Sequence, residues 1–275
     1  MYVSCSCLVC DRERYPTVED ALRQIAELGF GAFDLDVFEN WQHINPSALA
    51  EHVDEWKWRL ANATDETGLK VSSFNCGLSQ KPGSPDPAAF EQYAREFSAL
   101  LELAEALGCP NITLQPGPVL AEHSPDEQLA AMREHLAELA PIKGDRELTI
   151  SIEGHAHTLL EEPSVALDVV RDLWPGVGFT YDPSHPELLG FPLTDMAALV
   201  EYTCHVHVRN ASRGQMQATM EDGTVDFQWL VAALRDHGYD GALSIEYFGG
   251  FDAEFASVTA LRDRLVELGV AAQPG

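Results

Sequence analysis

Four segments in the second half of the chain each place an acidic or imidazole side chain where a short, apolar, strand-like run stops. The segments are LTISIEGHAH, VGFTYDPSH, CHVHVRN and ALSIEYF, and the side chains are Glu153, Asp182, His207 and Glu246. Three carboxylates and one imidazole form an oxygen-rich set that suits Mn2+ best, with Mg2+ or Co2+ as alternatives. We therefore expect these four residues to bind one divalent metal ion.

A metal ion with four protein ligands keeps about two coordination positions open, enough to chelate a hydroxy-ketone through its carbonyl and the neighbouring hydroxyl. The adjacent C–H becomes acidic, and a carboxylate on each side of the substrate can remove the proton and return it. Glu153 and Glu246 are the candidate catalytic pair, because they end the first and the last of the four segments. Either one alone would pass for an ordinary surface carboxylate, and only the set of four favours a site.

The four segments share a pattern of polar and apolar side chains that indicates their place in the fold. With the two-residue period of a strand, the side that bears the ligands is small or polar and the other side is large and apolar. Ser151 leads to Glu153 and Ser244 leads to Glu246, while Ile152 lies on the opposite side. This distribution predicts a parallel barrel with a polar mouth and with helices covering its outer surface.

The whole chain of 275 residues shows eight alternations of strand-like and helix-like segments. A single-domain (β/α)8 barrel over residues 1–275 is therefore the expected fold class, rather than an open doubly wound sheet. The phosphate-binding signatures GxGxxG and GxxxxGK[ST] are absent, which weakens a nucleotide-cofactor hypothesis. The expected strands are residues 2–9, 31–38, 69–79, 111–117 and the four segments above, and the expected helices are residues 17–29, 45–68, 87–108, 125–140, 163–173, 193–202, 225–238 and 255–268.

The charge balance limits the classes of molecule that the protein can bind. Seventeen basic against 44 acidic residues give a formal net charge of -27, which opposes binding to nucleic acid and is typical of a well-solvated surface. The first residues lack a basic stretch followed by an apolar one, and no apolar run reaches membrane-spanning length. We expect a soluble, cytoplasmic protein with a small-molecule substrate and no membrane partner.

Three of the six cysteines, Cys5, Cys7 and Cys10, lie close together near the start of the chain. They resemble part of a zinc site, but no second Cys/His pair follows nearby. Small, reduced residues that fill the barrel are the preferred interpretation.

Other polar residues near the four segments have two interpretations each. His185, three residues after Asp182, either contacts a substrate hydroxyl or caps the loop, and His155 and His205 are either packed histidines or site contacts. Arg213, or alternatively Arg209, could hold a substrate oxygen or phosphate, although arginines in such polar loops are more often solvated.

The motifs IEGHAH, TYDPSH, HVHVRN, DGTVDF and GYDGALSIEYF, which span roughly residues 148–250, resemble the xylose isomerase-like TIM-barrel superfamily. This superfamily of sugar phosphate isomerases and epimerases includes ketose 3-epimerases, hydroxypyruvate isomerases, inosose dehydratases and endonuclease IV. The resemblance implies the same four metal ligands, with Glu153 and Glu246 also acting as acid and base. It further implies substrate contacts from His185 and Arg213, and it is compatible with a homodimer or a higher homo-oligomer. His155 is a further candidate substrate contact because of its inward parity.

Ketose 3-epimerases carry another glutamate six residues after the first metal ligand, and this chain has Leu159 there. The resemblance therefore does not select a substrate. The expected function is a metal-dependent isomerase or epimerase acting on a sugar, a sugar acid or a cyclitol by proton transfer next to a carbonyl.

Three alternatives remain at this point. A dehydratase of a keto-cyclitol, similar to inosose dehydratases, would use the same metal site and expel a hydroxyl. An endonuclease IV-like nuclease needs histidines on the third and fourth strands, where this chain has Asn75, Cys76 and Gln115. A carbohydrate-binding barrel without turnover is disfavoured by the intact ligand set.

Overall fold

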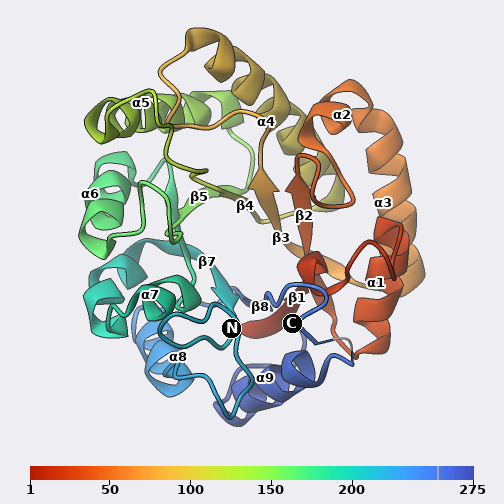
Figure 1. Cartoon of the computed structure of the whole chain (residues 1–275). Coiled ribbons are helices and arrows are strands. Elements are labelled where there is room, and N and C mark those ends of the chain that lie inside the picture. The colour runs from red at the N-terminus through yellow and green to blue at the C-terminus, as the bar shows by residue number, and fades with distance from the viewer. Residues whose placement is uncertain (253) are drawn as a thin grey trace.

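Eight parallel strands form one closed barrel in the computed structural model, which describes residues 1–252 and 254–275. Each strand pairs with its neighbours in chain order, and β8 pairs with β1 to close the ring. Figure 1 shows the ring of helices around the strands. The predicted (β/α)8 barrel is confirmed. The strands are β1 Tyr2–Ser6, β2 Ala32–Phe38, β3 Lys70–Gly77, β4 Asn111–Leu114, β5 Thr149–Glu153, β6 Gly178–Tyr181, β7 Thr203–Val208 and β8 Ala242–Ile245.

The helices alternate with the strands and lie outside them (Figure 1). None of the helices in the described part of the chain is both long and apolar enough to cross a membrane. The α-helices are α1 Val18–Glu27, α2 Pro46–Glu51, α3 Val53–Thr67, α4 Pro87–Leu107, α5 Pro125–Lys143, α6 Pro163–Leu173, α7 Ser184–Leu189, α8 Phe227–Asp236 and α9 Ala256–Glu267, and the 3-10 helices are η1 Cys7–Val9 and η2 Leu193–Tyr202.

Four helical segments differ from the sequence prediction. The strand expected over residues 2–9 ends at Ser6, and its last three residues form the 3-10 helix η1, because the Ser6 hydroxyl accepts from the backbone N–H of Leu8 and caps that helix. The single helix expected over residues 45–68 is two helices, α2 and α3, because the backbone of His52 leaves the helical region with φ -133° and ψ 36°. The segment expected as an α-helix over residues 193–202 is the 3-10 helix η2, in which Leu193, Met196 and Leu199 are buried. Their spacing of three matches the three residues per turn of a 3-10 helix. The short helix α7 after β6 was not predicted.

The two sides of each strand have different surroundings. Apolar side chains such as Ile152 and Phe179 are fully buried in the core between strands and helices. The barrel interior is polar: the hydroxyl of Thr180 is 2.8 Å from that of Thr113 and 2.7 Å from that of Ser151. This arrangement confirms the predicted division, with the larger hydrophobic core outside the barrel.

The cysteines of the first strand do not all fill the barrel. In β1 the hydroxyl of Ser6 donates to Asp36 inside the barrel, so Cys5, with the opposite parity, packs in the outer hydrophobic core. The interpretation as reduced, buried residues therefore holds for Cys5, but its predicted place inside the barrel is wrong.

The two ends of the chain meet at the amino-terminal end of the barrel. The backbone N–H of Val3 donates to the carbonyl of Ala271 at 2.8 Å, and the N–H of Ala271 donates to the carbonyl of Met1 at 3.1 Å. Figure 1 shows both ends near β1. These bonds fasten the segment after α9 to the first strand.

The connection from β3 to α4 is anchored by a buried carboxylate. Glu96 of α4 is fully buried, and it accepts hydrogen bonds from the backbone N–H of Ser79 at 2.9 Å and from the Ser79 hydroxyl. Gln92, one helical turn earlier, donates to the same carboxylate at 2.8 Å. The start of this connection is therefore fixed to the helix that follows it.

We expect Glu96→Ala to lower the free energy of unfolding by about 1–3 kcal/mol, because the Ser79 N–H and hydroxyl lose their acceptor. Glu102→Ala is the matched control on the same helix, where the carboxylate is exposed and pairs with Lys57, and it should cost less than about 1 kcal/mol. Urea unfolding followed by circular dichroism measures both. Equal losses would show that the buried anchor contributes nothing.

Candidate active site

The structure brings the four predicted ligands together at the carboxyl-terminal end of the barrel. Glu153 is the last residue of β5, Asp182 directly follows β6, His207 lies near the end of β7, and Glu246 directly follows β8. All four side chains are buried, and one ligand atom from each lies within 4.8 Å of the others. Because parallel strands end at the same edge, residues far apart in sequence converge there.

His207 lies among the carboxylates. Its Nδ1 is 2.7 Å from an oxygen of Glu153 and 3.7 Å from an oxygen of Glu246, and its Nε2 is 3.4 Å from Asp34. Burial opposes a charged imidazole, yet Glu246 and Glu153 outweigh it and raise the pKa of His207 well above its usual value. Asp34 is itself held by His205 at 2.7 Å, so a second layer supports the ring.

Arg209, two residues after His207, is a second positively charged group of the site. It is 1% exposed, and its guanidinium donates to Glu246 at 2.7 Å and to Asp182 at 2.9 Å. It also donates to Nε2 of His185 at 3.0 Å. One guanidinium thus links two carboxylates and an imidazole, and it offsets part of their negative charge.

Two side-chain amides hold the candidate catalytic pair. Asn75 donates to Glu246 at 2.6 Å, and Gln115 donates to Glu153 and to the Asn75 carbonyl oxygen, the latter at 3.0 Å. From the sequence alone, Asn75 and Gln115 were interpreted only as the absence of the histidines that a nuclease needs. Their inward parity at the ends of the third and fourth strands was the signal that could have placed them in the site.

The two glutamates differ in how readily they bind a proton. Burial raises the pKa of Glu246 to about 7, although His207 and Arg209 act in the other direction. Burial would also raise the pKa of Glu153, but the neighbouring His207 holds it below its usual value. Two carboxylates with different proton affinities at one site are suited to acid and base roles.

The other predicted contacts lie at different depths. His155 lines both cavities of the barrel mouth, and its ring centroid is 3.8 Å from that of His185. His185 is 1% exposed, and burial lowers its pKa well below the usual value, so it is a neutral acceptor for Arg209. Arg213 is exposed and lies beside Gly190 at the end of α7.

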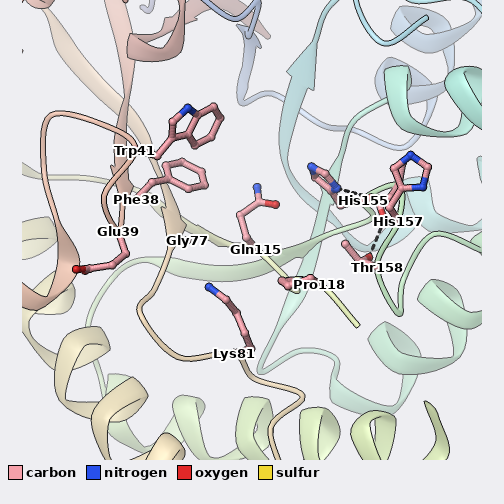
Figure 2. Close-up of a pocket in the computed structure, with 12 residues that line it drawn as sticks. Phe38, Glu39, Trp41, Gly77, Lys81, Gln115, Pro118, His155, His157 and Thr158 are labelled. Carbon is pink, nitrogen blue, oxygen red and sulfur yellow. Dashed lines mark hydrogen bonds between the residues drawn. The ribbon is translucent and has the colours of Figure 1, made fainter. Parts of the chain in front are cut away.

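Two adjoining cavities lead to the buried residues. The inner one, about 40 Å3, is lined by Asn75, Glu153 and Glu246 among others, and the outer one has a volume of about 410 Å3. Gln115 and Trp41 line both cavities. Figure 2 shows the outer cavity between the aromatic pair Phe38 and Trp41 on one side and His155 and His157 on the other. A small polar molecule therefore has a route to the carboxylates.

The four ligand atoms fit a single divalent cation. Three buried carboxylates face one guanidinium, so negative charge predominates within the set of Glu153, Asp182, Glu246 and Arg209. Nδ1 of His207 faces two of the carboxylates and is the nitrogen available to such an ion. Oxygen donors with one imidazole suit Mn2+, Mg2+, Co2+ or Zn2+.

The comparisons with known proteins agree on one family. A family model described as a xylose isomerase-like TIM barrel matches residues 22–263. The L-ribulose-5-phosphate 3-epimerase UlaE of Salmonella paratyphi C is 24% identical over 237 residues, which cover 82% of this chain and 81% of that protein.

Solved structures share the fold over nearly the whole chain. The 3-keto-D-glucoside 4-epimerase YcjR from E. coli, in its apo form, superposes with a TM-score of 0.73 at 20% identity and covers 98% of this chain and 99% of that one. The IOLI protein with a bound zinc atom superposes with a TM-score of 0.74 at 17% identity and covers 98% of both chains.

We expect Arg209→Met to lower the free energy of unfolding by about 3–5 kcal/mol, because Asp182 and Glu246 stay buried without their guanidinium. Arg213→Met, an exposed position four residues later, should change it by less than about 0.5 kcal/mol. Urea unfolding in the presence of a chelator measures both variants. An Arg209 variant as stable as the Arg213 variant would contradict the compensating role of Arg209.

Proposed function

Because this chain belongs to the xylose isomerase-like TIM-barrel family, we propose that it is a divalent-metal-dependent epimerase or isomerase of a sugar, a sugar acid or a cyclitol. The observation that carries the proposal is the convergence of Glu153, Asp182, His207 and Glu246 within 4.8 Å. The similarity to a protein named as a sugar phosphate 3-epimerase supports the reaction class. The reaction is proton transfer at a carbon next to a carbonyl.

The proposed cofactor is one divalent ion, preferably Mn2+, held by the same four residues. When bound, it would polarise the substrate carbonyl and acidify the neighbouring C–H. The excess of buried carboxylates over guanidinium supports this proposal, as does the zinc atom named with the IOLI structure. Arg209 pairs with Asp182 and Glu246 and so orders these two carboxylates.

Glu153 and Glu246 move the proton. They end β5 and β8, which are not neighbours in the barrel, so a substrate between them meets one carboxylate on each side. One carboxylate oxygen accepts the proton from the substrate carbon, and the other glutamate returns a proton to the opposite face or to the next atom. The Asn75 and Gln115 amides fix the orientation of both carboxylates.

The substrate hydroxyls are assigned to the histidines and the arginine around this pair. His155 lines both cavities and is placed to contact a bound sugar directly. His185, whose ring is tilted by 40° against that of His155 and which accepts a hydrogen bond from Arg209, is proposed to hold a hydroxyl near Asp182. Arg213 is proposed to reach the substrate from the loop after β7.

We expect the purified protein to bind about one equivalent of Mn2+, and Asp182→Asn to reduce the affinity at least tenfold, because a charged ligand is lost. Asp54→Asn, at a side chain that is 94% exposed, should bind the ion like the wild type. Isothermal titration with metal-free protein, together with elemental analysis, measures both. Full affinity in the Asp182 variant would exclude this carboxylate as a ligand.

We expect Glu246→Gln to fold normally and to lose about 10²- to 10⁴-fold in turnover, because its amide cannot accept the proton. A panel of ketoses and keto-inositols in D2O, followed by NMR and mass spectrometry, measures the reaction. Epimerisation or isomerisation exchanges deuterium without loss of water, whereas a dehydratase changes the product mass by one water. A Glu246→Gln variant with the wild-type rate would remove that residue from the mechanism.

A further inference from the structure

A single lysine lies in the wall of the outer cavity. Lys81 extends from the connection between β3 and α4, and its ammonium donates to the carbonyl of Leu78 at 2.8 Å. An ammonium has three N–H donors, so two remain for a ligand. The other charged residue of the lining is Glu39, whose carboxylate accepts from the Ser47 hydroxyl at 2.8 Å. Figure 2 shows Lys81 beside Gln115 and the Glu39 carboxylate pointing outward.

The structure around Lys81 is arranged to hold it there. Gly117, which lines the same cavity, has φ +73°, and a Cβ at this position would overlap the aliphatic part of the Lys81 side chain. Only a glycine permits both this backbone and this contact without strain. Glu96 fixes the start of the same connection through Ser79. The lysine is thus seated in the cavity rather than free on the surface.

Its surroundings leave the positive charge incompletely stabilised. Burial lowers the pKa of Lys81, and the more distant Glu96 and Glu39 only oppose this. Within the described residues, Lys81 forms no ion pair with a carboxylate. A bound anion would supply the missing partner.

We propose that Lys81 binds a negatively charged group, a phosphate or a carboxylate, at the end of the substrate remote from Glu153 and Glu246. The proposal rests on the proposed function and narrows its substrate to an anionic sugar. Gln115 lines both cavities, so one molecule passing it can reach Glu153 inside and Lys81 outside. The outer cavity, about 410 Å3, lies within the usual range for small-molecule sites.

The net charge makes a local cation necessary for such a substrate. A chain with a formal charge of -27 repels anions over most of its surface. A phosphate or carboxylate can be held against this field only where a fixed positive group and N–H donors meet it. Lys81 provides both at the cavity wall.

Matched ketoses test the assignment. D-fructose, D-fructose 6-phosphate and D-fructuronate share one carbon skeleton and differ in the group at the sixth carbon. We expect the Mn2+-loaded protein to bind at least one of the two anions roughly tenfold tighter than D-fructose in isothermal titration. The anion that binds more tightly than D-fructose shows whether the site prefers a phosphate or a carboxylate.

The variant Lys81→Met keeps the aliphatic contact with Gly117 and removes the charge. In this variant the two anions should bind no more tightly than D-fructose binds to the same variant. Lys57→Met, which removes the same charge from the outside of α3, should keep the tighter binding of the anion and so corrects for the overall field. A wild type that prefers neither anion, or a preference that survives in Lys81→Met, overturns the proposal.

Inorganic phosphate separates this inference from the proposed function. Titrated into metal-free protein, inorganic phosphate should bind to the wild type and to Lys57→Met with similar affinity. It should bind to Lys81→Met at least tenfold more weakly. Equal or absent binding in all three overturns the anion site. If phosphate binding depends on Lys81 but no ketose exchanges a proton, the anion site stands and the proposed reaction fails.

Discussion

The burial of three carboxylates at one place is the constraint on which the site depends. Glu153, Asp182 and Glu246 cannot all be charged in a dry barrel mouth unless positive charge lies among them. His207 near the end of β7 and Arg209 directly after this strand provide it, through contacts of 2.7–2.9 Å. The same arrangement leaves negative charge over, which a divalent cation can neutralise. Folding and chemistry therefore use one set of contacts.

The sequence predicted the fold and the convergence of the ligands because both follow from regular geometry. The two-residue period of a strand put Glu153, His207 and Glu246 on the inner side, and parallel strands brought their ends to one edge. The helix break at His52 and the 3-10 geometry of η2 could not be predicted in this way. They depend on how these segments pack against the barrel, and helix propensity contains no information about that packing.

The parts of the site outside the strands were the least predictable. The sequence offered Arg213 and, as the alternative, Arg209, and in the structure Arg209 contacts the carboxylates. The role of Lys81 depends on a contact with Gly117 in another connection of the barrel, 36 positions later in the chain. Loop conformations of this kind are set by tertiary contacts between segments that no local pattern relates.

The backbone hydrogen bond between Val3 and Ala271 holds both ends of the chain at one side of the barrel. Both ends of the chain leave the barrel at the amino ends of its strands, while the cavities open at the carboxyl ends. A fusion partner, an affinity tag or a surface tether joined to either end would thus depart from the side of the barrel opposite the two cavities. The molecule can be immobilised or displayed at its termini with its entrance left clear.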